Sequence, residues 1–175
     1  MLPVGTKIQK INAAVSNKNR QACFYIHSNC EESSLFLEQS NHIREANNVE
    51  TITMQTLMER FKLSQVDILK IDAEGAELVI FDGCSNEKLE NINQICVEFH
   101  KWMGIGTRMD VRRVINKIES SGFRSFSLIR CNYQAVLFVN RRLMSAWQYW
   151  CTWLCVWVPR VVNYACRKIR GKRVS

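Results

Sequence analysis

The segment Val66–Glu77 constrains the fold more than any other part of the chain. The apolar run Val66–Ile71 predicts a β-strand that is buried on both faces. Two carboxylates, Asp72 and Glu74, follow at once, and Gly75 allows a sharp turn into a helix. In an open α/β sheet, ligands bind beyond the carboxyl ends of the strands, so these carboxylates are predicted to lie at a functional edge.

A second strand pattern also ends in titratable groups. The apolar run Ile95–Val97 is followed by Glu98 and, after one aromatic residue, by His100. Because the carboxyl ends of parallel strands meet at one edge of a sheet, we expect these groups to lie near Asp72 and Glu74. A simpler interpretation is that Asp72 only caps the following helix, with Glu74 favoured by the helix dipole. Four titratable groups at two strand ends favour a chemical role.

Strand and helix patterns alternate along the rest of the chain, which is typical of parallel α/β structure. Residues 110–121 predict an amphipathic helix with aliphatic residues on one face, and Gly122 is expected to end it. The domain is predicted to end near Asn140. The other expected elements are strands near 7–15, 21–26, 49–53 and 92–98, a helix near 56–62, a helical stretch that ends at Phe81, and an antiparallel hairpin of 123–129 with 133–139.

The distribution of charge divides the chain at about residue 140. Residues 1–140 hold equal numbers of basic and acidic side chains, whereas residues 141–175 hold eight basic and no acidic ones. Since phosphate contacts demand a basic face, general nucleic-acid binding by the domain is not favoured. The eight cysteines form no Cys-x-x-Cys pair, which favours a reducing compartment over a disulfide framework. Cys23, Cys84 and Cys96 are expected to be buried thiols. The sequence does not decide whether Cys23 forms a disulfide with Cys30 or Cys151 with Cys155.

The octet Lys70–Glu77 resembles a motif of the FkbM family of S-adenosylmethionine-dependent methyltransferases. The resemblance continues in Asp82-Gly83 and in Glu98-Phe99-His100, and weaker similarities lie upstream in residues 12–16, 33–35, 49–53 and 56–57. Together these segments cover roughly residues 7–140. The octet is the most specific of them.

The resemblance implies that residues 1–140 form an α/β domain, a partial Rossmann-like class I methyltransferase sheet that closes with the C-terminal antiparallel hairpin. It also implies that Ala14 and Ser16 bind the cofactor together with Asp72. The family's first strand and glycine-rich cofactor turn should precede Lys7, where the sequence has no such segment. Their absence should leave one edge of the Val66–Ile71 strand unpaired. We therefore expect an incomplete gene product, or a chain that needs a missing N-terminal segment or a partner chain.

The reaction that the resemblance implies is methyl transfer from S-adenosylmethionine to a hydroxyl oxygen of a sugar, a lipid-linked glycan or a small molecule. We expect Asp72 to position the donor or the acceptor. His100 is the expected general base, because imidazole titrates nearest to neutral pH. Glu74 and Glu98 would orient these groups. A divalent cation held by Asp72, Glu74 and the substrate is a less favoured alternative.

The tail carries a separate signal. From Leu143 to Pro159 no residue is charged, and the tryptophans of this run project within roughly a third of the helical circle. Tryptophan prefers the membrane–water interface and bases attract anionic lipids, so residues 143–170 predict an amphipathic C-terminal helix that lies on a membrane surface. A helix that spans the membrane is the alternative interpretation, although the charge-free run is shorter than the roughly 20 residues that a transmembrane helix needs. Packing of the tryptophans on the domain or on a partner subunit is the third interpretation.

Two classes of function follow from these patterns. The first is a methyltransferase that is complete only with its missing first half. The tail slightly favours an acceptor near a membrane for this enzyme, although the same helix could merely anchor the protein. The second is a catalytically inactive methyltransferase-like module that acts as a membrane-peripheral interaction protein. In both cases the chain is expected in the cytoplasm, either free or peripheral at a membrane.

Overall fold

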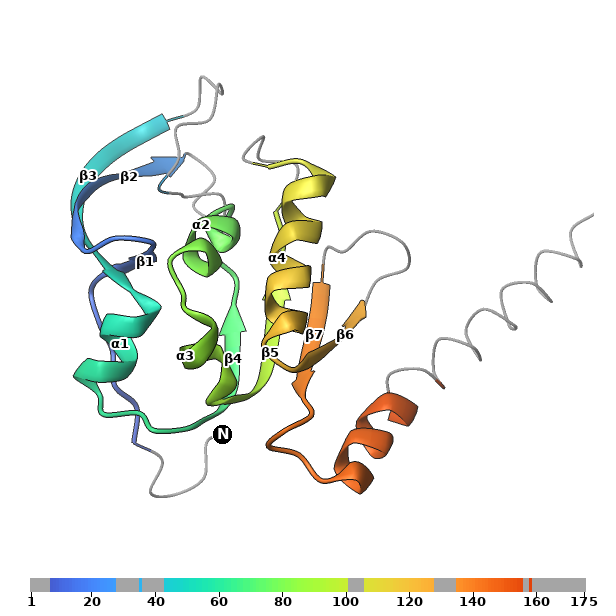
Figure 1. Ribbon diagram of the computed structural model, residues 1–175. Helices are drawn as coiled ribbons and strands as arrows, with labels where there is room; N and C mark the ends of the chain where they lie inside the picture. The colour runs from blue at the N-terminus through green and yellow to red at the C-terminus, as the bar shows by residue number, and fades with distance from the viewer. Residues whose placement is uncertain are drawn as a thin grey trace, which may run out of the picture.

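The computed structural model describes residues 7–27, 35, 43–100, 106–127, 135–155 and 158. These residues form a mixed α/β structure, as the sequence predicts, but their strands form two sheets and not the single Rossmann-like sheet that the family resemblance implies (Figure 1). The strands are β1 (Ala14–Ser16), β2 (Arg20–His27), β3 (Ile43–Thr53), β4 (Val66–Ile71), β5 (Ile92–Glu98), β6 (Phe123–Ser127) and β7 (Ala135–Asn140). The helices are α1 (Met54–Arg60), α2 (Glu77–Asp82), α3 (Asn86–Glu90) and α4 (Arg108–Ser120), and residues 146–155 form a further helix.

The larger sheet has the strand order β4-β5-β7-β6. β4 and β5 are parallel, with Ile71 opposite Val97 near their carboxyl ends, whereas β7 runs antiparallel to both β5 and β6. Helices α2, α3 and α4 lie over one face of this sheet (Figure 1). The hydrophobic core fills the space between them, and Phe81, Ile95 and Phe138 have no exposed surface. This arrangement places the carboxyl ends of β4 and β5 side by side.

β4 is less buried than its apolar sequence predicts. Ile68 is 67% exposed, and Asp67 and Lys70 are exposed as well. The prediction of a strand buried on both faces is therefore wrong. The reason is that helices cover one face, while among the described strands β4 pairs with β5 alone. Its second edge is the one that the sequence predicts to be unpaired.

The smaller sheet has the order β1-β3-β2, with β1 parallel and β2 antiparallel to β3. β3 begins at Ile43, well before the predicted strand near 49–53, because it pairs with β2 along nearly its whole length. The predicted strand near 7–15 is wrong for most of its length, since β1 pairs with β3 only from Ala14 to Ser16. The described strands thus form two separate sheets, and no described strand joins β1 to β4.

α4 confirms the predicted amphipathic helix. It begins at a capping box, in which the Thr107 hydroxyl accepts from the backbone N–H of Asp110 and the Asp110 carboxylate accepts from the backbone N–H of Thr107. Its aliphatic face is buried, and Gly122 follows with a φ of 93° that ends the helix. α1 begins two residues before its predicted start, because Thr53 is its N-cap. The short helix α3 was not predicted.

The tail leaves the larger sheet at the end where β5 begins. The side-chain amide of Asn140 donates to the carbonyl oxygens of Glu90 and Ile92, each over 2.9 Å, and holds the end of β7 there. Helix 146–155 then packs against β6, where the ring of Tyr149 lies 6.3 Å from that of Phe126. None of the described helices has both the length and the apolar character needed to cross a bilayer.

The five cysteines in the described residues are free thiols. Cys151 and Cys155 are therefore unpaired, whereas Cys30 lies outside the described residues. Cys84 is buried as predicted, and burial raises the pKa of its thiol to about 11. Cys23 and Cys96 are only half-buried.

Candidate active site

The chain leaves β4 through a tight turn that carries Asp72 and Glu74 at the sheet edge, and Glu77 opens the helix that follows. Glu74 and Gly75 both adopt the left-handed conformation, with φ of 44° and 97°. A glycine takes this conformation freely, whereas at Glu74 it costs about 1 kcal/mol. α2 then begins with Ala76 as its N-cap and without a side-chain cap. The interpretation of Asp72 as a helix cap is therefore wrong.

Glu77 is the buried centre of the site. Its residue surface is 1% exposed, and its Oε1 accepts hydrogen bonds from the backbone N–H groups of Ala73 (3.1 Å) and Gly75 (3.2 Å). The same oxygen lies 2.7 Å from Nδ1 of His100. A buried carboxylate is costly unless it is paired and hydrogen-bonded, and these three contacts provide both.

His100 stands just beyond β5, with a side chain that is 5% exposed. Because Glu77 Oε1 already acts as an acceptor for two N–H groups, we assign the ring proton facing it to Nδ1. Nε2 then faces the other two carboxylates, 3.6 Å from Oδ1 of Asp72 and 3.5 Å from Oε2 of Glu74. Both distances exceed an ordinary hydrogen bond. The predicted proximity of Asp72, Glu74 and His100 is confirmed.

Lys70 and burial set the electrostatics of this cluster. Nζ of Lys70 lies 2.8 Å from Oδ2 of Asp72, and this contact raises the pKa of the lysine. Burial raises the pKa of Glu74, and the neighbouring carboxylates add to this rise while His100 opposes it. A carboxyl group whose pKa is raised by burial and by neighbouring charges is a common feature of functional sites.

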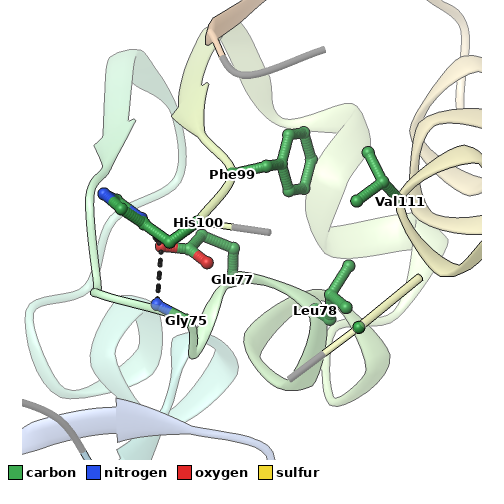
Figure 2. Close-up of a pocket in the computed structure, with 7 residues that line it drawn as sticks. Gly75, Glu77, Leu78, Phe99, His100 and Val111 are labelled. Atoms are coloured by element: carbon green, nitrogen blue, oxygen red, sulfur yellow. Dashed lines mark hydrogen bonds and ion pairs between the residues drawn. The ribbon is translucent and has the colours of Figure 1, made fainter. Parts of the chain in front are cut away.

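A small pocket lies beside the Glu77–His100 pair (Figure 2). Its polar side is formed by these two residues, and Phe99 and Val111 lie together on its apolar side. A side chain at Gly106 would clash with Leu78, so the glycine keeps the two segments close together. The pocket is small and has room only for a group about the size of a water molecule or a hydroxyl. Its full lining is Gly75, Glu77, Leu78, Phe99, His100, Gly106 and Val111.

The cluster also has the donor set of a divalent cation site. Asp72, Glu74 and His100 each offer one ligand atom, and these atoms lie within 4.8 Å of one another. Glu77 holds the second ring nitrogen of His100, as carboxylates commonly do behind metal-bound histidines. The residues therefore fit a cation, although Lys70 already supplies positive charge to Asp72.

The remaining predicted residues lie further from this centre. Glu98 ends β5 and raises the pKa of Glu74 through its charge, as the last of several causes. Ala14 and Ser16 lie in β1, on the smaller sheet, and are not on the sheet that carries the cluster. Sequence reasoning gave no separate role to Glu77. The sequence did contain an indication of such a role, because Glu77 is an acidic residue at the start of an otherwise apolar helical run.

Comparison with known families covers the segment that holds these residues. The sequence model described as the methyltransferase FkbM domain matches residues 2–125, which include the turn after β4, Glu77 and His100. No curated protein and no solved structure matches the chain. Because the match covers most of the chain, it establishes the family, and with it methyltransferase as the general class of function. The chain belongs to the FkbM methyltransferase family.

Proposed function

We propose that the protein is an S-adenosylmethionine-dependent methyltransferase that methylates a hydroxyl oxygen, with His100 as the general base. The observation that carries this proposal is the 2.7 Å contact between Nδ1 of His100 and the buried carboxylate of Glu77. It fixes the ring and directs Nε2 toward the sheet edge. A hydroxyl group must lose its proton during methylation, and an oriented imidazole is suited to accept it.

Each residue of the cluster has a distinct part in the proposed reaction. When bound, S-adenosylmethionine supplies an electrophilic methyl group on a sulfonium centre. His100 Nε2 would accept the proton that the acceptor hydroxyl loses when its oxygen is methylated. Glu77 is a positioning residue, which holds Nδ1–H and stabilises the imidazolium that forms. Asp72 and Glu74 are placed to orient the acceptor hydroxyl beside Nε2.

The donor is proposed to bind at the carboxyl end of β4. Asp72 lies there with a side chain that is 35% exposed, so its carboxylate is accessible to the hydroxyl and ammonium groups of the donor. Ala14 and Ser16 are proposed to contribute from β1. The second edge of β4 offers backbone groups for a further strand, from another segment or from a partner chain, that would complete the donor site.

The acceptor is proposed to be a sugar, a lipid-linked glycan or a small molecule that places one hydroxyl beside Nε2 of His100, next to Asp72 and Glu74. A divalent cation on Asp72, Glu74 and His100 is the less favoured alternative. It would lower the pKa of the acceptor hydroxyl in place of a base. Sensitivity of the reaction to a chelator, with recovery on adding Mg²⁺ or Mn²⁺, would favour the cation.

The test combines donor binding with methyl transfer. Calorimetric titration with S-adenosylmethionine measures donor affinity, and transfer of a tritiated methyl group to a panel of hydroxylated sugars and phenols measures activity. We expect His100→Gln to lower kcat by about 10²- to 10⁴-fold with donor affinity unchanged. We expect Asp72→Asn to weaken donor binding.

Asp67→Asn is the matched control, because Asp67 is an exposed carboxylate on the same strand at its opposite end. This variant should bind the donor and transfer methyl groups like the unmodified chain. Full activity of His100→Gln would refute the role of the base. A chain that binds no donor would instead favour the catalytically inactive module.

A further inference from the structure

Helix 146–155 presents an apolar ridge that nothing in the described residues covers. Trp147 is 76% exposed, Trp150 55%, Leu154 48% and Val158 46%. Their spacing of three, four and four residues places them on one face of a helix. Large exposed apolar patches on soluble domains mark binding surfaces. We call this face the tryptophan ridge.

The opposite face of the helix anchors it to the domain. Tyr149 packs on Phe126 of β6, and the guanidinium of Arg124 lies 5.9 Å from the centre of the Tyr149 ring. Trp153 is half-buried and contacts Trp150 edge-on at 5.8 Å. The predicted stripe of tryptophans is thus divided, because Trp153 belongs to the inner face while Trp147 and Trp150 point outward. The ridge is therefore held in a defined direction relative to the sheet.

The charge of the sequence on either side of the ridge indicates the kind of partner. Arg141 is exposed just before the helix, and residues 160–173 hold six further basic and no acidic side chains. Tryptophan prefers the membrane–water interface, and each base near an anionic leaflet contributes about 1 kcal/mol. We propose that the tryptophan ridge docks this protein on an anionic membrane surface, with the helix lying in the plane of the interface.

The position of the ridge decides which way the active site faces. β7 runs antiparallel to β5, so the tail begins where β5 begins, whereas His100 follows the end of β5. Seven residues of β5 separate these ends, which corresponds to roughly 20 Å at about 3.3 Å per residue. Figure 1 shows helix 146–155 below the sheet and α2, which follows the active-site turn, toward the other end.

A protein docked by the ridge would therefore hold its active-site edge away from the lipid. This step rests on the proposed function and narrows its acceptor. We infer that the acceptor hydroxyl belongs to a water-soluble molecule, or to a headgroup long enough to reach into the aqueous phase. The sequence-based expectation of an acceptor close to the membrane is revised accordingly.

The test measures vesicle binding of the full chain without any donor or acceptor, so its failure is distinct from failure of the proposed reaction. The probe is a vesicle of phosphatidylcholine with about 30% phosphatidylserine, compared with phosphatidylcholine alone. Four of the five tryptophans lie in the tail, so a blue shift of tryptophan fluorescence and co-sedimentation both report binding. We expect binding to the anionic vesicles that weakens with added salt.

Trp147→Glu is the decisive variant, because its exposed side chain can change with little effect on folding. We expect it to weaken binding at least about tenfold. Met109→Glu is the matched control, since Met109 is 82% exposed and opens α4 at the active-site end. It should leave binding unchanged. Unchanged binding of Trp147→Glu would overturn the proposal, and loss of binding in Met109→Glu would show that the active-site end faces the membrane.

Discussion

Replacing Glu77 by alanine tests whether this buried carboxylate organises the active site. The change removes the acceptor of three hydrogen bonds, from the backbone N–H groups of Ala73 and Gly75 and from Nδ1 of His100. A buried donor left without a partner costs about 1 to 3 kcal/mol. Water that enters the new cavity would accept hydrogen bonds from some of the three donors and so reduce the total cost. We therefore expect Glu77→Ala to lower the free energy of unfolding by about 4 kcal/mol.

Glu77→Gln separates the hydrogen bonds from the charge. Its amide oxygen can still accept from Ala73 and Gly75, so the loss is confined to the charge-assisted contact with His100 and should be about 1 to 2 kcal/mol. Urea unfolding followed by circular dichroism measures both losses, provided that the m-value stays constant. Glu59→Ala is the control, since its carboxylate is 56% exposed in its contact with Lys88 and should contribute less than about 1 kcal/mol.

The same variants report on the tautomer of His100. At about pH 9, where an ordinary imidazole is neutral, nitrogen NMR of the unmodified chain should show the proton of His100 on Nδ1. The His100→Gln spectrum identifies the signal among the three histidines. Glu77→Ala should lose this preference. A proton on Nε2 in the unmodified chain, or a loss of less than about 1 kcal/mol in Glu77→Ala, would refute the reasoning.

Two further predictions concern the helix that lines the pocket and the buried thiol. Thr107→Ala should destabilise the protein by about 1 kcal/mol, because it removes the cap of α4. Since bonds from Thr107 lower the pKa of Asp110, the stabilisation from the ionised Asp110 is present above its unfolded pKa and disappears as pH falls through its folded pKa. Chemical unfolding should therefore show that the difference in free energy of unfolding between the Thr107→Ala variant and the unmodified chain becomes smaller as pH falls through this range. A difference that stays constant with pH would contradict this prediction. Because the pKa of the buried Cys84 thiol is raised to about 11, Cys84 should react with iodoacetamide at pH 8 far more slowly than the exposed Cys155. Peptide mass spectrometry would measure both rates. Equal rates would mean that Cys84 is accessible.

Elements with a strong local signal were predictable from the sequence. The apolar run before Asp72 and the amphipathic pattern of α4 each identified a real element, because hydrophobic periodicity and capping are properties of neighbouring residues. The extent of β3 was not predictable, since strand length depends on pairing with β2. The exposure of Ile68 was also missed, because burial depends on which elements cover a strand.

The sequence by itself determined the family, the chemical groups at the ends of two strands and the basic, tryptophan-rich character of the tail. These features reside in residue identity and local order, which any copy of the chain carries before it folds. Only the tertiary structure decided that Glu77 turns inward to hold His100 and that the tryptophan ridge and the candidate active site lie at opposite ends of β5. The reason is that hydrogen-bond partners and direction are set by the packing of segments that are distant in the chain.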